Sequence, residues 1–446
     1  MSTAVRPAAG DSDLPAGRVH DVLRAHMLTD GFDLVLDLEN SRGTHVVDLR
    51  DGTAYLDMFA FFASSALGMN HPALADDDEF LRELAAAAID KPSNSDMYTV
   101  PMARFVDTFA RVLGDPALPH LFFVDGGALA VENALKVAFD WKSRLNETHG
   151  LDPALGTRVL HLTEAFHGRS GYTLSLTNTD PVKIARFPKF DWPRIDAPYL
   201  TDGRDIEAAE QRTLAQARRA FAEHPHDIAC FLAEPIQGEG GDHHFRPEFF
   251  ARMQQLCLEH DALLILDEVQ TGCGLTGTAW AYQQLGVTPD VVAFGKKTQV
   301  CGIMAGGRVD RVHDNVFEVS SRINSTWGGN LTDMVRARRI LEVIEEDRLI
   351  DRARLCGAHL LTRLEHLAAS HDAVTEPRGR GLMCAITLPT PEFRDDTVTA
   401  LREREHVLIL PTGVRGIRFR PPLTVTIAEL DAAVDAIDRV LARAHA

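Results

Sequence analysis

The sequence is short of positive charge and has no long hydrophobic run. Lys and Arg total 46 against 64 Asp and Glu, which gives the 446-residue chain a net charge of −18. Such an acidic surface repels nucleic-acid phosphates and anionic lipids, so we do not expect a main role in binding either. No apolar stretch approaches the roughly 20 residues needed to cross a bilayer. The first fifteen residues contain no apolar signal core, so we expect no secretory targeting.

Paired cysteines and metal-binding motifs are also missing. The six cysteines are far apart and none forms a C-x-x-C motif, and the 19 histidines form no H-E-x-x-H motif. These absences argue against a zinc site and against a disulfide framework. We therefore predict no bound metal and a reducing, cytoplasmic location.

The sequence does contain an alternation of helical segments with short, almost entirely apolar runs. Strands of this kind, separated by helices, are typical of a parallel sheet that is covered on both faces. The runs that we expect to form this sheet are residues 121–124, 159–162, 228–233, 262–266 and 291–294.

The two ends of the chain predict a smaller α/β unit. Residues 46–58 have the pattern of a hairpin that turns at Asp51-Gly52. The C-terminal part again alternates helical and strand patterns. The boundaries that we expect are a disordered N-terminus at 1–17, a first segment of the small domain at 18–65, the large domain at 66–335 and the rest of the small domain at 336–446.

Chemically useful side chains follow the predicted strands. Gly126-Gly127, Asp267 and Lys296 each come at or just after the end of one, and ligands of parallel sheets bind beyond the carboxyl ends of the strands. A lysine there is a candidate for forming a Schiff base, and an acid there could hold a protonated ring nitrogen. Each residue also has an ordinary interpretation: a tight turn, a helix cap and a surface lysine.

Several motifs in this order resemble those of the class III (omega) aminotransferases. The resemblance implies a fold type I α/β architecture and pyridoxal 5'-phosphate as the cofactor. It extends from the hairpin near Val46 to Leu423. The motifs are Gly126-Gly127-Ala128, Phe166-His167-Gly168-Arg169, Glu234-Pro235 with Glu239, Asp267-Glu268-Val269-Gln270, Gly295-Lys296, residues 325–330, and Arg418-Phe419-Arg420-Pro421-Pro422.

The resemblance implies roles for residues around the cofactor ring. Lys296 would form the covalent link and later move the substrate proton, although the neighbouring Lys297 stays an open alternative. Asp267 would pair with the ring nitrogen and keep it protonated. The other ring contacts that it implies are Phe166 and Val269 on the two faces, Gln270 on the phenolic oxygen, and Glu234 as a further cofactor-binding residue.

The cofactor phosphate would lie at Gly127 and Ala128, where the free N–H groups of a helix N-terminus favour an anion. The family usually offers a Ser or Thr hydroxyl in this loop, and Ala128 cannot. More of the anchoring would then come from Ser325 and Thr326, which in relatives belong to the other subunit. The resemblance therefore implies a homodimer whose active sites are completed across the interface.

The residues at 92–96, 122–128 and 295–299 resemble those in the branch of the family that transfers the terminal amine of L-lysine to 2-oxoglutarate. Arg169 would hold the distal carboxylate of either substrate, with Asn324 near the lysine head group. Glu239 would pair with Arg418 and swing away when a carboxylate arrives beside the reacting carbon. Alternatives are an ornithine, acetylornithine or 4-aminobutyrate aminotransferase, an aminomutase or racemase, and a non-catalytic protein on the same scaffold.

Overall fold

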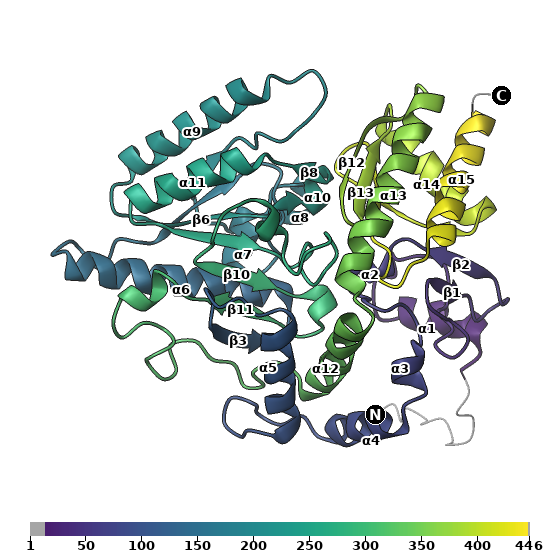
Figure 1. Ribbon diagram of the computed structural model, residues 1–446, viewed down its shortest axis with the longest axis horizontal. Coiled ribbons are helices and arrows are strands. Elements are labelled where there is room, and N and C mark those ends of the chain that lie inside the picture. Colours follow the sequence, from purple (N-terminus) through teal and green to yellow (C-terminus); the bar gives the residue numbers. More distant parts are fainter. Residues whose placement is uncertain (1–13, 445–446) are drawn as a thin grey trace, which may run out of the picture.

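A seven-stranded sheet forms the centre of the larger part of the molecule (Figure 1). The computed structural model describes residues 14–444. The strands run parallel except β11, which is antiparallel to both of its neighbours, so the predicted mostly parallel sheet is confirmed. Their order is β3 (His120–Val124), β11 (Cys301–Ala305), β10 (Val291–Phe294), β9 (Leu263–Asp267), β6 (Ile228–Ala233), β4 (Arg158–Leu162) and β5 (Arg194–Ile195).

Helices cover both faces of this sheet. Alternate residues of a strand point to opposite faces, and in β9 they enter two different hydrophobic cores: Leu264 and Leu266 one, Leu263 and Ile265 the other. The continuous apolar character of the strands follows from this double burial. The face of Leu263 packs on α6 (Gly127–Thr148), and the opposite face packs on α5 (Val100–Val112), α9 (Ile206–Glu223), α11 (Pro247–Glu259) and α12 (Leu331–Glu346).

A smaller unit joins the two ends of the chain, as expected. The predicted hairpin is present as β1 (His45–Val47) and β2 (Ala54–Asp57), and β2 pairs in parallel with β14 (Val407–Leu408). Figure 1 accordingly shows the purple N-terminal hairpin beside the yellow C-terminal helices. The remaining elements are the antiparallel strands β12 (Thr375–Arg380), β13 (Met383–Thr387), β16 (Gly416–Phe419) and β15 (Leu410–Thr412), with helices α13 (Leu349–Ser370), α14 (Pro391–Arg404) and α15 (Ile427–Ala444).

The apolar run at 407–410 is divided between β14 and β15 because its residues join two different sheets. The domain boundaries at 65 and 335 stay predictions. Of the segment predicted to be disordered, residues 1–13 lie outside the described residues, while Ala16 and Gly17 belong to a 3-10 helix. No helix in the described part of the chain is both long and apolar enough to span a bilayer.

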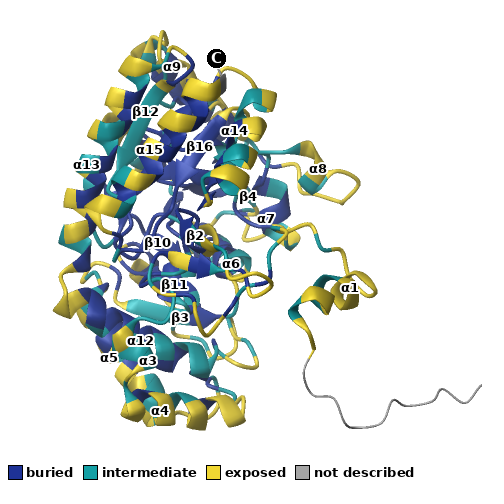
Figure 2. Ribbon diagram, turned by 90° about the vertical axis from the view of Figure 1, so that its right-hand side faces the viewer, coloured by how far each residue is buried: buried dark blue, intermediate teal, exposed yellow. Residues whose placement is uncertain are grey.

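Short elements connect these units. Figure 2 shows the exposed helix α1 standing away from the body, and it has no buried residue. The remaining elements are the helix α4 (Asp78–Ile89) and the short elements η1 (Ala16–Arg18), α1 (Val19–Arg24), α2 (Ala60–Ala63), α3 (Pro72–Ala75), α7 (Gly171–Leu176), α8 (Pro181–Ile184), β7 (Ile236–Gln237), α10 (Gly238–Gly241), β8 (His243–His244), η2 (Ala281–Gln284), η3 (Lys296–Thr298) and η4 (Val309–Arg311).

Candidate active site

The predicted lysine and acid come together because β9 and β10 are parallel neighbours. Asp267 is the last residue of β9 and lies in register with Ala293 of β10. Lys296 follows β10 after the single residue Gly295 and is the first residue of η3. Both side chains therefore emerge at the carboxyl edge of the sheet, where parallel sheets bind their ligands.

The Lys296 side chain is half-buried and its amine is unpartnered. Among residues 14–444, no hydrogen bond or ion pair reaches its Nζ. Burial, helped by the positive charge of Arg418 and opposed by Asp267 and Glu234, lowers its pKa to about 8. Lys296 also lines a groove of about 750 Å³ whose other walls include Phe61, Phe80 and Cys301. A lysine of this kind is available as a neutral nucleophile close to neutral pH.

Lys297, the open alternative, lies in a different environment. Its Nζ donates hydrogen bonds to the carbonyls of Ala63 at 2.9 Å and Ser65 at 3.4 Å. The side chain is fully enclosed, and burial lowers its pKa to about 7. Residues 60–63 form a left-handed turn in which all four φ angles are positive. Lys297 thus fastens the lysine loop, residues 295–299, to this turn and its end.

Asp267 is held by a histidine that the sequence analysis quoted within a motif but gave no role. His167 Nδ1 lies 2.8 Å from Asp267 Oδ2, and both residues are buried. The Val269 backbone N–H donates to the other carboxylate oxygen at 3.1 Å. These two contacts fix the orientation of the acid at the strand end.

Glu234 ties the Phe166 segment to the loop after β6. Its two oxygens accept hydrogen bonds from the backbone N–H groups of Phe166 and Gly238, each at 3.0 Å. Burial raises the pKa of Glu234 to about 7, because desolvation outweighs the opposing effect of His167. Through these contacts Glu234 fixes the backbone of the segment that carries Phe166.

The start of α6 packs directly on the other predicted cofactor residues. A Cβ placed on Gly127 would lie 2.9 Å from Val269 Cγ1, and one on Gly168 would lie 2.6 Å from the Ala128 Cβ. The first N–H groups of this long helix have no partner within the helix and can bind an anion. The close packing brings this N-terminus to Val269 and to the segment that carries Phe166.

Gln270 is oriented by an ion pair that the sequence analysis did not identify. Its Oε1 accepts hydrogen bonds from Arg420 Nε at 3.0 Å and Nη2 at 2.9 Å. Arg420 is in turn bound in bidentate fashion by Asp242, and this pair is completely buried. Because the oxygen of Gln270 is taken, its NH₂ group is left to donate to a ligand.

Glu239 bridges two cations. Its Oε2 accepts a hydrogen bond from Arg418 Nη2 at 3.0 Å, as predicted, and its Oε1 accepts one from Lys183 Nζ at 2.6 Å. Burial alone would raise the pKa of Glu239, but Arg418 and Lys183 outweigh it and hold the pKa below its ordinary value. The carboxylate is therefore charged at neutral pH.

Four predicted residues are not joined to this cluster. Arg169 is exposed, with its guanidinium 5.9 Å from the Phe166 ring centroid. Asn324, Ser325 and Thr326 lie in the loop before α12, which hydrogen bonds attach to residues 94–95. Within residues 14–444 their side chains make no hydrogen bond to Lys296, Asp267 or Gln270.

The residues that the sequence analysis missed are His167, Lys183, Asp242 and Arg420. Two of them carried a usable signal: His167 lies inside a quoted motif, and Arg420 is two residues beyond Arg418 in a strand pattern, which puts both arginines on one face. Among residues 14–444 no cluster of His, Cys, Asp or Glu could hold a metal ion. The absence of a metal stays a prediction.

The family comparison agrees with this geometry. The model of the family Aminotransferase class-III matches residues 29–441. The chain is a class III aminotransferase. Its cofactor is pyridoxal 5'-phosphate, and the fold is that of the fold type I transferases.

Close relatives of this aminotransferase cover almost its whole length. An L-lysine-epsilon aminotransferase of Mycobacterium tuberculosis is 67% identical over 445 residues, 99% of this chain and 98% of the relative. One of Amycolatopsis lactamdurans is 60% identical over 450 residues, with coverage of 99% and 98%. A solved structure of the M. tuberculosis lysine aminotransferase in the internal aldimine form is 68% identical, has a TM-score of 0.95, and covers 96% of this chain and 100% of its own.

The residues present fit the cofactor. The unpartnered amine of Lys296 can react with an aldehyde, and the oriented carboxylate of Asp267 can neutralise a protonated ring nitrogen. The free NH₂ of Gln270 can donate a hydrogen bond, and the helix N-terminus at Gly127 can bind a phosphate. The narrow contact between Gly127 and Val269 leaves no space for a larger residue at the helix start.

Proposed function

We propose that this class III aminotransferase transfers the terminal amino group of L-lysine to 2-oxoglutarate. The products are 2-aminoadipate 6-semialdehyde and L-glutamate. The observation that carries the proposal is the ion pair between Glu239 and Arg418 beside the Lys296 amine. Full-length relatives at 57–67% identity that are named L-lysine-epsilon aminotransferases support the choice of donor.

The roles that we assign to the ring-binding residues follow from their contacts. Lys296 would bond covalently to the cofactor and move the proton at the amine-bearing carbon of the substrate. Asp267, oriented by His167, would hold the protonated ring nitrogen, and the bound cofactor would supply an electron sink. Gln270 would donate its free NH₂ to the phenolic oxygen. Phe166 and Val269 would lie on the two faces of the ring.

Two substrates with different charges must use one pocket. The reacting carbon of L-lysine carries no carboxylate, so Arg418 needs a partner from the protein, and Glu239 provides it. The keto carbon of 2-oxoglutarate carries a carboxylate, which replaces Glu239 on Arg418 because the planar guanidinium binds carboxylates well. Arg169 binds the distal carboxylate in both half-reactions, and Asn324 contacts the head group of lysine.

We also propose a homodimer in which the partner supplies Ser325 and Thr326 to the phosphate beside Gly127 and Ala128. Two observations support it: Thr326 is exposed, and the groove that ends at Lys296 is lined largely by apolar side chains. Co-expression of Lys296→Ala with Thr326→Ala tests it. Mixed dimers would contain one intact site and regain activity that neither variant has alone, and failure to regain it contradicts a shared site.

A cytoplasmic location belongs to the same proposal. All six cysteines are free and five of them are buried, which suits a compartment that keeps thiols reduced. Fractionation of cells that express the full chain tests the location, and recovery of the protein outside the cytoplasmic fraction would contradict it.

The function is tested by incubating the cofactor-loaded enzyme with L-lysine and 2-oxoglutarate and trapping the semialdehyde with 2-aminobenzaldehyde. The trapped product is expected only when both substrates are present. Faster turnover of ornithine, acetylornithine or 4-aminobutyrate would reassign the donor. Turnover of lysine without added 2-oxoglutarate would instead indicate an aminomutase or racemase.

A further inference from the structure

The contact between Lys183 and Glu239 is not needed to neutralise Glu239 in the arrangement just described, because Arg418 already does so. Nevertheless Lys183 Nζ lies 2.6 Å from Glu239 Oε1, while Arg418 Nη2 binds the other oxygen at 3.0 Å. One carboxylate thus has two cationic partners, one on each oxygen. If one partner is lost, the other is already in place.

The short helix α8 fixes Lys183 in this position. Asp180 caps the helix by accepting a hydrogen bond from the Val182 N–H at 2.9 Å. The Lys183 ammonium also lies 5.7 Å from the Phe166 ring centroid, and its side chain is only 19% exposed. Lys183 is therefore a packed side chain and not a freely moving surface lysine.

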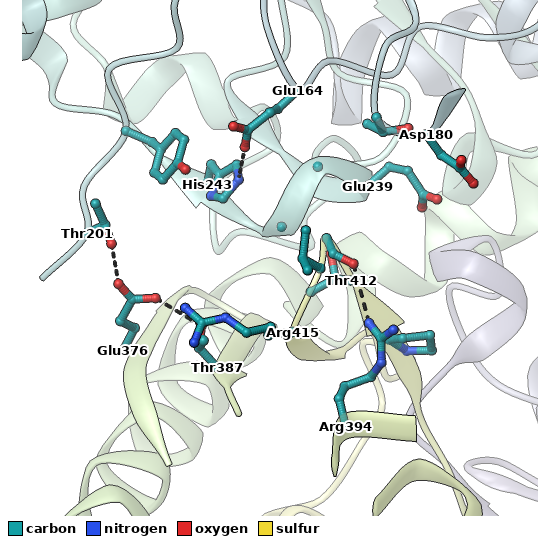
Figure 3. Close-up of a pocket in the computed structure, with 18 of the residues that line it drawn as sticks. Glu164, Asp180, Thr201, Glu239, His243, Glu376, Thr387, Arg394, Thr412 and Arg415 are labelled. Carbon is teal, nitrogen blue, oxygen red and sulfur yellow. Dashed lines mark hydrogen bonds and ion pairs between the residues drawn. The ribbon is translucent and has the colours of Figure 1, made fainter. Parts of the chain in front are cut away.

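A pocket of about 720 Å³ opens beside this contact. Figure 3 shows Glu239 projecting from the short helix α10 at the side of the pocket where Asp180 lies, with Thr412 of β15 below it. Lys183 lines the same pocket. The Glu239 side chain consequently has room to turn away from Arg418 without leaving the reach of Lys183.

The other cations that line this pocket are engaged elsewhere. Arg378 donates to the carbonyls of Gly241 and Asp242, Arg394 binds Asp395, and Arg415 donates to the carbonyl of Pro389. In the described part of the chain, Arg418 and Lys183 are the two side chains that bind the Glu239 carboxylate. Without Lys183, a displaced Glu239 would be a partly buried charge with no counter-ion, which is costly.

We propose that Lys183 is a positioning residue that holds Glu239 after a substrate carboxylate has displaced it from Arg418. Lys183 thereby favours the half-reaction with 2-oxoglutarate and has little effect on the half-reaction with L-lysine, in which Glu239 stays on Arg418. This inference rests on the proposed function, and in particular on the exchange of partners at Arg418.

The experiment compares the two half-reactions in Lys183→Met. Enzyme loaded with pyridoxal phosphate is mixed with L-lysine, and enzyme loaded with pyridoxamine phosphate is mixed with 2-oxoglutarate, while the visible absorbance is followed. We expect kcat/KM for 2-oxoglutarate to fall about tenfold, mainly through KM, because one charge-assisted hydrogen bond is lost. The lysine half-reaction should change by less than about twofold.

Two further variants separate this role from general damage. Lys183→Arg keeps the charge and should restore the 2-oxoglutarate half-reaction to within about threefold of the wild type. Lys136→Met makes the same chemical change on an exposed position of α6 and should alter neither half-reaction. If Lys183→Met fails to take up the cofactor, Lys183→Gln carries the same comparison.

An equal loss in both half-reactions, or no loss in either, overturns the inference. These results differ from a failure of the proposed function. A wild-type enzyme that does not react with L-lysine contradicts the proposed donor, whereas the pyridoxamine-loaded form still reports whether Lys183 assists the binding of 2-oxoglutarate.

Discussion

Two arginines at the end of β16 lie two residues apart and are built into very different surroundings. Arg418 is buried, but its partner Glu239 is 29% exposed, is shared with Lys183 and lines a pocket. Arg420 binds Asp242 through both oxygens, and the two side chains are 1% and 0% exposed. Glu239 and Asp242 both come from α10 and the residue after it. The same two segments thus supply one pair whose carboxylate has a second cationic partner and one pair that is fully enclosed.

We interpret the difference as a division of roles in a site that must bind two substrates. One ion pair can open, and the other holds a neighbouring side chain in place. A buried pair with two hydrogen bonds resists dissociation because either charge alone would be left without water or a partner. A pair at the edge of a pocket has an alternative partner for each member. Arg420 therefore holds Gln270 in one orientation, whereas in the proposed function Arg418 exchanges Glu239 for a substrate carboxylate.

We expect the largest effect on activity from substitution of one of the two adjacent lysines. Lys296 lines a groove and Lys297 is enclosed, so they show the same contrast as the two arginines. Lys296→Ala removes the amine that faces the groove and should lower transamination by on the order of 10⁴-fold or more. The visible absorbance of the bound cofactor should be lost with it. Lys297→Met should retain that absorbance, because Lys297 is bonded to Ala63 and Ser65. The reverse result would transfer the catalytic role to Lys297.

Breaking the enclosed ion pair should cost stability. Asp242→Asn leaves Arg420 charged and buried, and we expect the free energy of unfolding to fall by about 3–5 kcal/mol. Chemical denaturation of the cofactor-loaded protein measures the change. Glu239→Gln, made as the matched control at the pocket edge, should cost less than about 1 kcal/mol. Equal losses in the two variants would contradict the distinction between the pairs.

Glu239→Gln should instead alter the balance between the substrates. Without its negative charge, Arg418 is left unneutralised beside a donor carbon that carries no carboxylate. The half-reaction with L-lysine should slow by about tenfold while that with 2-oxoglutarate is maintained. Single-turnover measurements of the two half-reactions test this, and a slower 2-oxoglutarate half-reaction alone would argue against the exchange at Arg418.

The smallest effect concerns pH and two glutamates near the same loop. Burial raises the pKa of Glu234 from 4.5 to about 7, so its protonation stabilises the folded state fully below 4.5 and this contribution is lost as pH rises through 7. In the wild type, this loss lowers the free energy of unfolding as the pH rises from about 6 to about 8. We expect the decrease to be smaller by about 1 kcal/mol in Glu234→Gln. Glu239→Gln should leave the fall unchanged, because the pKa of Glu239 lies below its ordinary 4.5.

The central sheet could be predicted from the sequence because its strands are apolar throughout. Double burial leaves that pattern in β6, β9 and β10, and the residues at the strand ends then indicate the site. Strand β12 is different: it reads Thr-Glu-Pro-Arg-Gly-Arg and none of its residues is buried. Strand β12 has neither an apolar run nor an alternation of apolar and polar residues, so its hydrophobic pattern does not predict a strand.

Contacts between distant segments limited the prediction of the site. Arg420 meets Gln270 across 150 residues of sequence, and Lys183 meets Glu239 across 56. Charged residues are common on surfaces, and nothing local distinguishes these from solvated ones. The strand alternation from Arg418 to Arg420 indicates a shared face but does not identify the partner. The acid Asp242 became identifiable only when the fold brought α10 to the end of β16.

The bonds from Lys297 to Ala63 and Ser65 have a consequence for the order in which the protein can assemble. The turn at 60–63 leaves the ribosome long before the lysine loop that it supports, and β2 is made before β14, its neighbour from near the other end of the chain. Residues 54–65 therefore cannot make these contacts until the lysine loop and β14 have been synthesised. Because Lys296 is the neighbour of Lys297, we expect its amine to reach its final position only after the lysine loop has met this turn.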